Sequence, residues 1–263
     1  MTPHEAADAA DALWQRIQDQ VDALSTEDWA RPCAPCPGWD VHDLVSHIAG
    51  LTTMFAGLPQ PVAPEDWQAP ADLNPIDTMT ETGVAARRGR SPEQQRQELA
   101  EARFAHVEGV RQLADMEGET VGPTGPSTQA AFFRVRMFDL WHHLWDLRDA
   151  VGATQALEDD STAAIECHRY VADLAPWLYG RKARAPEGAA VRLQLGAPLD
   201  LDRSVAVTEG RARFTDELAE DVVRGPAALF TLVMTGRVAP EDADGLLADG
   251  DEAQRLLGAR LFG

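Results

Sequence analysis

The stretch RMFDLWHHLWDLR, residues 136–148, decides the fold of this chain. With about 100° of rotation per residue in a helix, Arg136, Asp139, His143 and Asp146 fall within an arc of about 80°. Large apolar and aromatic side chains occupy the rest of the wheel, which is typical of a helix buried inside a bundle. Because unpaired buried charge is costly, this polar stripe must face polar partners.

A partner for the stripe lies on an earlier helix, which we expect to run from residue 40 to about residue 57 with Asp40 as its cap. On a helical wheel, His47 falls at the edge of the arc that faces the core. We therefore expect His47, Asp139 and His143 to look inward together. Two imidazoles and one carboxylate leave coordination positions open, as a catalytic metal requires. The alternative is an ordinary Asp–His hydrogen-bond pair within a buried network.

Apolar periodicity and helix-start signals predict three more helices, two long and one short, before the helix that carries the polar stripe ends at Gly152. Ser91 followed by Pro92 is a good helix start, and a long proline-rich connection precedes it. Four long helices joined by one long connection describe a four-helix bundle. The predicted helices span residues 3–24, 40–57, 91–117 and 128–151, and the connection over residues 58–90 contains one short helix over residues 77–87.

After the helix that carries the polar stripe, the sequence changes from helical periodicity to segments in which apolar and polar residues alternate. We therefore place a domain boundary there and expect domains over residues 1–155 and 156–263. Alternating apolar and polar residues predict half-buried strands in the second domain. Together with its helices they describe a small α+β domain. The predicted elements are a linking helix over 157–179, strands over 191–195, 203–214 and 219–223, a helix opened by Gly225-Pro226, and a helical stretch over 241–257.

Composition excludes several classes of partner. The chain has 263 residues and a formal net charge of −20, which disfavours nucleic acid and anionic membrane surfaces. The first residues carry acidic groups and no apolar run, so no signal peptide is expected. No apolar stretch is long enough for a membrane span, and three cysteines form no disulfide framework. We therefore expect a cytoplasmic protein.

Several polar residues receive a structural interpretation. Cys33 and Cys36 form a CxxC, interpreted as an incidental loop pair rather than a redox motif or metal knuckle. Cys167 is expected in the core. His142 points about 100° away from His143 and is expected beside the site or at the surface. Asp146 is expected to orient a ligand histidine.

Other aromatic residues receive similar interpretations from their spacing. His42, His106 and His168 are expected on the solvent faces of helices. Trp39 and Trp141 are expected to serve packing rather than substrate stacking.

Two motifs carry a family resemblance. The run CPGWDVHDLVSHIAGL, residues 36–51, resembles the start of the mycothiol-dependent maleylpyruvate isomerase family, which belongs to the DinB-like metal-binding helical bundles. The run RMFDLWHHLWDLRDAVG, residues 136–152, resembles the second signature of that family. The resemblance covers roughly residues 1–155. The remainder is more loosely similar to the sterol-carrier-like domain often appended in the family.

The resemblance implies a divalent metal, usually zinc, held by His47, Asp139 and His143. Founding members have glutamate in place of Asp139, and many relatives have an acidic residue in place of Leu144. The resemblance also implies mycothiol, the low-molecular-weight thiol of actinobacteria, as cofactor or co-substrate. A family arginine implicated in catalysis matches Arg237 best, with a helix C-terminal cap as the alternative interpretation.

We therefore expect a DinB-like four-helix bundle followed by a small sterol-carrier-like α+β domain. The expected activity is that of a zinc-dependent, mycothiol-using isomerase or S-transferase acting on a small electrophilic metabolite. One alternative is a non-catalytic small-molecule-binding or regulatory protein, which the departures at Asp139 and Leu144 motivate. The other is a metal-dependent hydrolase that uses bound water instead of a thiol.

Overall fold

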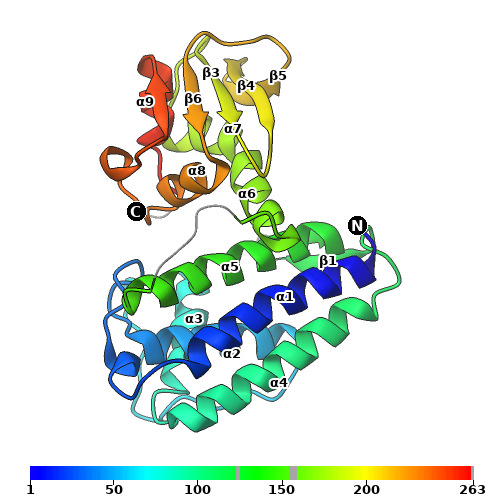
Figure 1. Ribbon diagram of the computed structural model, residues 1–263, viewed down its shortest axis with the longest axis vertical. Coiled ribbons are helices and arrows are strands. Elements are labelled where there is room, and N and C mark those ends of the chain that lie inside the picture. Colours follow the sequence, from blue (N-terminus) through cyan, green and yellow to red (C-terminus); the bar gives the residue numbers. More distant parts are fainter. Residues whose placement is uncertain (123–124, 154–158, 262–263) are drawn as a thin grey trace. The chain divides into compact units, whose positions relative to one another are not determined.

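The computed structural model describes residues 1–122, 125–153 and 159–261. The chain divides into two compact units, Met1–Gln155 and Ala156–Gly263 (Figure 1). The first unit is helical and the second is built around a five-stranded sheet. None of the helices in these described ranges is both long and apolar enough to cross a lipid bilayer.

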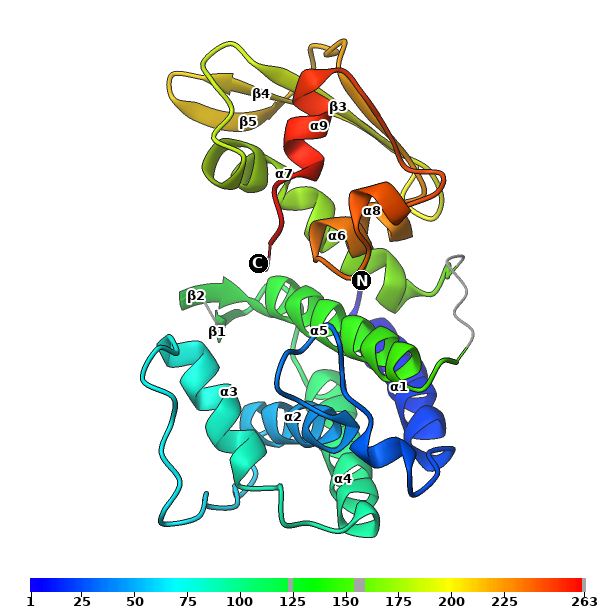
Figure 2. The same ribbon diagram turned by 90° about the vertical axis from the view of Figure 1, so that its left-hand side faces the viewer.

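Four long helices form the bundle of the first unit, as predicted. Within it, α1 packs against α4 and α5, and α2 packs against the same two helices. A shorter helix, α3, packs against α2 (Figure 2). The helices are α1 Pro3–Asp22, α2 Val41–Phe55, α3 Pro75–Ala85, α4 Pro92–Arg111 and α5 Gln129–Ala150.

Side-chain caps set where the bundle helices begin. The Asp40 carboxylate accepts from the amide of Asp43 and starts α2, and Ser91 starts α4 with a capping box in front of a proline. Each cap satisfies amide groups that have no partner inside the helix. The caps predicted at Asp40 and Ser91 are confirmed. The Asp40 cap sets where α2 begins after the loop that carries Cys36 and Trp39.

The remaining parts of the first unit differ from the predictions in two places. Between the helices predicted over 91–117 and 128–151, where we expect a turn-rich break without strands, β1 Glu119–Gly122 pairs antiparallel with β2 Gly125–Thr128. Phe104, which we expect among the apolar residues that form the inner face of the helix predicted over 91–117, is 71% exposed. It lies five residues after the buried Leu99, about 140° around the helix, which turns it away from the core.

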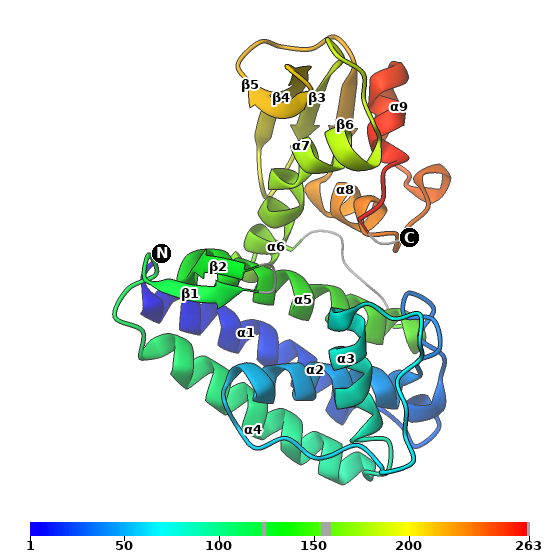
Figure 3. The ribbon, with the colours of Figure 1, turned by 180° about the vertical axis from the view of Figure 1, so that it is seen from behind.

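The second unit carries a mixed sheet with strand order β5-β4-β3-β6-β7. The pairing of β3 with β6 is parallel, and the other neighbours are antiparallel. Helix α7 packs on β4 and β5, whereas α9 packs on β3, β6 and β7 (Figure 3). The strands are β3 Ala190–Leu195, β4 Leu201–Thr208, β5 Arg211–Thr215, β6 Val222–Gly225 and β7 Leu247–Asp249.

The helices of the second unit are shorter than predicted. Residue 157, the predicted start of the linking helix, lies outside the described residues; α6 Thr162–Asp173 begins at the Ser161 cap. Pro176, in the following α7 Ala175–Trp177, interrupts helical hydrogen bonding, and a π-helical turn follows over Leu178–Lys182. The other helices are α8 Ala227–Met234 and α9 Asp251–Leu257.

The predicted strand over residues 203–214 is two strands joined by a tight turn. Glu209 and Gly210 both have positive φ, 54° and 69°, which matches the twist of a two-residue hairpin turn. The predicted third strand is confirmed with its bounds moved to β6 Val222–Gly225. The predicted final helical stretch contains β7 before α9, because Gly245 and Gly250 adopt positive φ and break the helix. The four-helix bundle and the small α+β unit are confirmed; the likeness of the second unit to sterol-carrier domains stays a prediction.

A fully buried arginine ties α3, α2 and α4 together inside the bundle. Arg87 Nε donates to both carboxylate oxygens of Glu98, at 3.1 and 3.0 Å, and its Nη1 donates to the carbonyl of Gly83 at 2.9 Å. The same guanidinium lies directly over Gly50 of α2, where a Cβ would stand 2.8 Å from Nη1. Gly50 is therefore the residue that lets this ion pair approach the helix backbone.

Substituting Gly50 with alanine tests this close approach. The added methyl group meets a guanidinium that Glu98 holds in place, and overpacking of this kind costs about 1–3 kcal/mol. This exceeds the gain of about 1 kcal/mol that alanine brings inside a helix. We expect Gly50→Ala to lower the free energy of unfolding measured by urea denaturation.

The matched control is Gly109→Ala in α4, where a Cβ meets nothing within 4 Å. This variant should be unchanged or more stable by up to about 1 kcal/mol. Equal effects of the two substitutions would contradict the proposed role of Gly50.

Candidate metal centre

His47 of α2 and Asp139 and His143 of α5 bring their side chains together in the interior of the bundle. Asp139 Oδ1 lies 3.7 Å from His47 Nε2 and 3.5 Å from His143 Nε2. The two imidazole rings are 4.7 Å apart and nearly perpendicular. Both histidines are buried, and the Asp139 side chain is 20% exposed. The structure thus assembles the three residues that the sequence singled out.

The spacing of these atoms suits a small cation. All three potential ligand atoms lie within 4.8 Å of one another. Tetrahedral zinc with bonds of about 2.0–2.1 Å requires ligand atoms about 3.3 Å apart. The observed separations from Asp139 are close to this value. Two imidazole nitrogens and one carboxylate oxygen also match the donor set of catalytic zinc sites, so the residues present fit such a metal.

Arg136 determines how Asp139 presents its carboxylate. Arg136 Nη1 donates to Asp139 Oδ2 at 2.9 Å, which leaves Oδ1 facing the two histidines. Burial alone would raise the pKa of Asp139. The Arg136 guanidinium and the neighbouring histidines outweigh burial and hold the pKa of Asp139 well below its usual range. Asp139 is therefore an anion, the form that binds a metal.

Asp146 holds the opposite edge of the His143 ring. His143 Nδ1 lies 3.0 Å from Asp146 Oδ2, and the Asp146 side chain is fully buried. With a proton on Nδ1, the ring donates to Asp146 and directs Nε2 at Asp139 and His47. This carboxylate–histidine arrangement is how proteins orient metal ligands. The role expected for Asp146 agrees with this geometry.

The two histidines differ in their protonation in this metal-free arrangement. Burial lowers the pKa of His47 more than the Asp139 carboxylate raises it. Burial also opposes the charge on His143, but Asp139, followed by Asp146, raises the pKa of His143 well above its ordinary value. The cluster therefore holds its proton on His143.

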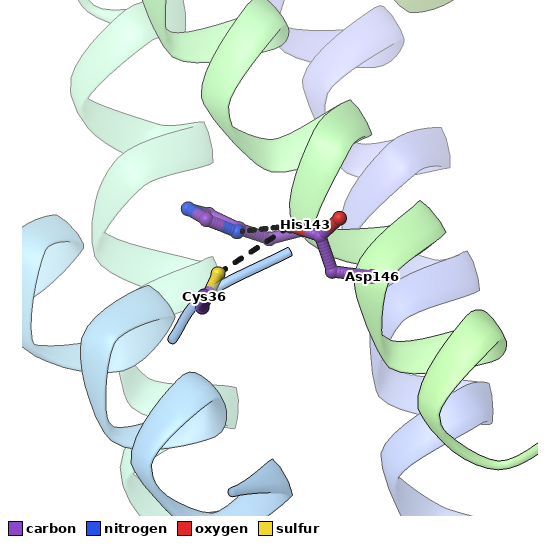
Figure 4. Close-up of side chains that lie close together, drawn as sticks. All are labelled: Cys36, His143 and Asp146. Carbon is purple, nitrogen blue, oxygen red and sulfur yellow. Dashed lines mark hydrogen bonds and ion pairs between the residues drawn. The ribbon is translucent and has the colours of Figure 1, made fainter. Parts of the chain in front are cut away.

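Cys36 joins the site from the loop that precedes α2, which the sequence interpretation missed. Its Sγ lies 3.8 Å from Asp146 Oδ2 and belongs, with His143 and Asp146, to a second close group of potential ligands (Figure 4). A hydrogen bond with the Cys33 thiol, together with burial, raises the pKa of Cys36. Cys36 is therefore a neutral thiol that donates a hydrogen bond to Asp146. The interpretation of the CxxC as neither a redox motif nor a metal knuckle stays a prediction, and the contact of Cys36 with Asp146 is the feature that the sequence did not reveal.

Aromatic side chains enclose the cluster. The Trp39 ring lies 5.1 Å from the His47 ring, and its indole nitrogen donates to Glu81 of α3 at 2.9 Å. Trp141 is buried and stacks on Trp145 at 6.0 Å. Both tryptophans pack as expected, and Trp39 additionally lies against the His47 ring.

A pocket of about 150 Å³ opens beside His47. It lies between α2, α3 and the start of the long connection, and Met54 and Met79 contribute polarisable walls. The pocket gives a small molecule access to the His47 side of the cluster.

His42, His106 and His168 are packed rather than solvent-facing, contrary to prediction. His106 Nδ1 accepts from the Trp14 indole at 2.8 Å, and His168 is fully buried with Nδ1 2.9 Å from Thr231 Oγ1. His42 is half-buried and its Nε2 lies 2.9 Å from the carbonyl of Arg90. Distant hydrogen-bond partners turned these rings inward, and helical spacing does not reveal such partners.

The other sequence candidates lie as follows. His142 is buried beside the cluster, with Nδ1 2.7 Å from the carbonyl of Phe138, and it takes no part in the groups of potential ligands found among the described residues. Cys167 is fully buried, as predicted. Arg237 belongs to the second unit, where Nη1 donates at 3.1 Å to the carbonyl of Thr235, the C-cap of α8. This contact is the one that the capping interpretation expects.

Comparisons with known proteins agree on one family. A family model described as the mycothiol maleylpyruvate isomerase N-terminal domain matches residues 10–148, more than half of the chain. Comparison with curated protein sequences gave no significant match.

Two solved structures resemble the whole chain in fold. One is the mycothiol-dependent maleylpyruvate isomerase, with a TM-score of 0.62. The other is a histidine-to-alanine mutant of the mycothiol-dependent maleylpyruvate isomerase, with a TM-score of 0.61. Each shares 16% sequence identity with this chain, and each alignment covers 94% of this chain and 93% of the other. With a matching bundle fold and a family model over the segment that carries the cluster, the chain belongs to the mycothiol maleylpyruvate isomerase N-terminal domain family.

Proposed function

We propose that the protein is a metal-dependent enzyme that uses mycothiol and acts on a small electrophilic metabolite as an isomerase or S-transferase. The observation that carries this proposal is the convergence of His47 Nε2, Asp139 Oδ1 and His143 Nε2 in the bundle interior. Membership of a family named for a mycothiol-dependent isomerase supports the thiol. The strongly negative net charge of the chain supports a small-molecule partner rather than nucleic acid.

In this proposal the three cluster residues hold a divalent metal, most simply zinc. Such a metal lowers the pKa of a thiol that coordinates it, so that a nucleophilic thiolate is available near neutral pH. Arg136 keeps Asp139 ionised and fixes its Oδ2. Asp146 fixes the ring of His143 so that Nε2 faces the cluster.

The surroundings of the cluster favour a small electrophile. The pocket beside His47 measures about 150 Å³, whereas pockets for drug-sized ligands are about 300–1,000 Å³. The side chains of Met54, Met79 and Leu51 give this space apolar walls, which favours attack by a thiolate over competing hydrolysis. Arg237 is the proposed catalytic residue of the second unit, by its match to the family arginine.

Metal content is the first test. We expect the full-length protein, purified without chelator, to carry near-stoichiometric divalent metal, measured by plasma mass spectrometry. His47→Ala and His143→Ala should each lose most of it, because two protein ligands hold a metal far more weakly than three. His4→Ala, which removes an exposed histidine from the first turn of α1, is the matched control and should retain wild-type metal. A wild-type protein that neither carries nor takes up divalent metal would contradict the proposal.

The Asp146–His143 contact gives a prediction with a defined sign. In metal-free protein the His143 pKa is raised, so the protonated ring stabilises the fold. That stabilisation is fully present below the ordinary histidine pKa of about 6.5 and is lost as the pH rises through the raised value. Asp146→Asn removes one stabilising carboxylate and should lower the His143 pKa, measured by NMR titration of the imidazole nitrogens.

The same variant should weaken metal binding by about 10–100-fold, as expected for loss of a carboxylate that orients a ligand histidine. Asp149→Asn, an exposed position on the same helix, is the control with the same change of charge. An unchanged His143 titration in Asp146→Asn would show that Asp146 does not orient the ring.

Thiol dependence separates the proposed enzyme from its alternatives. We expect the metal-loaded protein to bind mycothiol in calorimetric titration and to turn over electrophilic substrates only when the thiol is present. Arg237→Ala should lose activity while retaining metal and thiol binding, and Arg237→Lys should recover part of it. Turnover of esters or amides without any thiol would favour a hydrolase. Absence of mycothiol binding would favour a non-catalytic protein.

A further inference from the structure

A second pocket lies inside the first unit, apart from the metal cluster. It has a volume of about 250 Å³ and is bounded by α2, α4, α5 and β1. None of the three cluster residues is among those that line it. Its distinctive lining residues are Thr52, Phe55, His106, Gly109, Phe132 and Arg136.

Arg136 brings hydrogen-bond donors to this pocket that the protein does not use. The side chain is 2% exposed, and it makes two hydrogen bonds, from Nη1 to Asp139 and from Nη2 to Thr52 Oγ1 at 2.7 Å. Within the described parts of the chain, its buried Nε has no acceptor. A guanidinium has five N–H groups and cannot accept a hydrogen bond. The Nε is closed to solvent, but Nη1 and Nη2 each keep a second N–H that no described residue accepts, and Arg136 lines the pocket. Leaving donors unpaired in the interior is costly, so an acceptor in the pocket would stabilise the guanidinium.

His106 offers a second donor, because its tautomer is fixed. The Trp14 indole nitrogen can only donate, and it donates to His106 Nδ1 at 2.8 Å. The ring proton must then sit on Nε2. Burial, with the nearby Arg136 charge, lowers the pKa of His106 to about 3, so the ring is neutral at physiological pH. No described residue accepts a hydrogen bond from Nε2, and the ring lines the pocket.

Two aromatic rings give the pocket flat apolar walls beside the uncharged polar side chains of Thr52, Thr120 and Gln129. Phe55 and Phe132 meet edge to face with ring centroids 5.0 Å apart, and the Arg136 guanidinium lies 5.3 Å from the Phe55 ring. No acidic side chain is among the described residues that line the pocket. The space therefore combines aromatic walls with unused donors, which suits a ligand that has an anionic acceptor at one end and an apolar body at the other.

We propose that this pocket binds a small carboxylic acid with a flat apolar body, whose carboxylate accepts hydrogen bonds from Arg136 and His106. A bound carboxylate would give the guanidinium the acceptor that it lacks. The ligand would lie one side chain away from the metal cluster, because Arg136 also donates to Asp139. The site requires neither metal nor thiol, so it stands independently of the proposed enzymatic activity.

Calorimetric titration of the full-length protein with benzoate and benzamide tests the site. The two probes share shape and size, but only benzoate carries the charge. We expect benzoate to bind with millimolar or better affinity and benzamide to bind at least about tenfold more weakly, since charged hydrogen bonds exceed neutral ones. The result should be the same with and without added zinc.

Four variants locate the bound probe. Gly109→Leu fills the pocket without removing a donor, since a Cβ at Gly109 meets nothing within 4 Å, and it should abolish benzoate binding. His106→Phe removes one donor while keeping an aromatic ring and should weaken binding by about tenfold. Arg136→Gln should abolish it. Arg134→Gln, which removes a cation from the same helix but outside the pocket, should bind as wild type.

Three outcomes would overturn the proposal. These are failure of the wild type to bind benzoate, equal binding of benzoate and benzamide, and wild-type binding by Gly109→Leu. Circular dichroism of each variant checks the fold. Should Arg136→Gln fail to fold, Gly109→Leu and His106→Phe still decide the question, because neither alters the Arg136–Asp139 pair.

Discussion

The ion pair between Arg136 and Asp139 is the interaction on which the site depends. The two residues lie one turn apart on α5, and Arg136 Nη1 is 2.9 Å from Asp139 Oδ2. Removing an arginine from water inside a bundle is costly, and Asp139 offsets part of that cost. In return, the guanidinium keeps Asp139 ionised and turns its free oxygen toward His47 and His143. Without this pair, the stripe would be an isolated set of buried polar groups.

Two neighbourhoods meet at this pair. On the side of Asp139 lie the two histidines, with Asp146 and Cys36 behind His143. On the other side lies the aromatic pocket with His106 and Phe55. Arg136 belongs to both, because its guanidinium donates to Asp139 on the side of the cluster and lines the pocket on the other side. The buried polar stripe therefore places one charged group, the Arg136 guanidinium, between the cluster and the pocket.

Position 139 is an aspartate in this chain and a glutamate in founding family members, and the structure accommodates the shorter side chain. Its shorter side chain still brings Oδ1 within 3.5 and 3.7 Å of the two imidazole nitrogens. This is possible because the partner histidine comes from α2, which packs directly on α5. The cluster also relies on the Asp40 cap, which sets the start of α2 and thereby the height of His47. The departure is therefore compatible with the three-residue geometry.

By itself, the sequence determined which helices are buried and which polar residues share one face, because those properties follow from helical periodicity and from capping residues such as Asp40 and Ser91. That was sufficient to predict the bundle and to single out His47, Asp139, His143 and Asp146. Only the tertiary structure decided that Cys36 caps Asp146, that His106 faces a pocket and not solvent, and that Phe104 is exposed. Each of these depends on contacts between residues far apart in the chain, and periodicity within one helix carries no information about the partner that lies across from it.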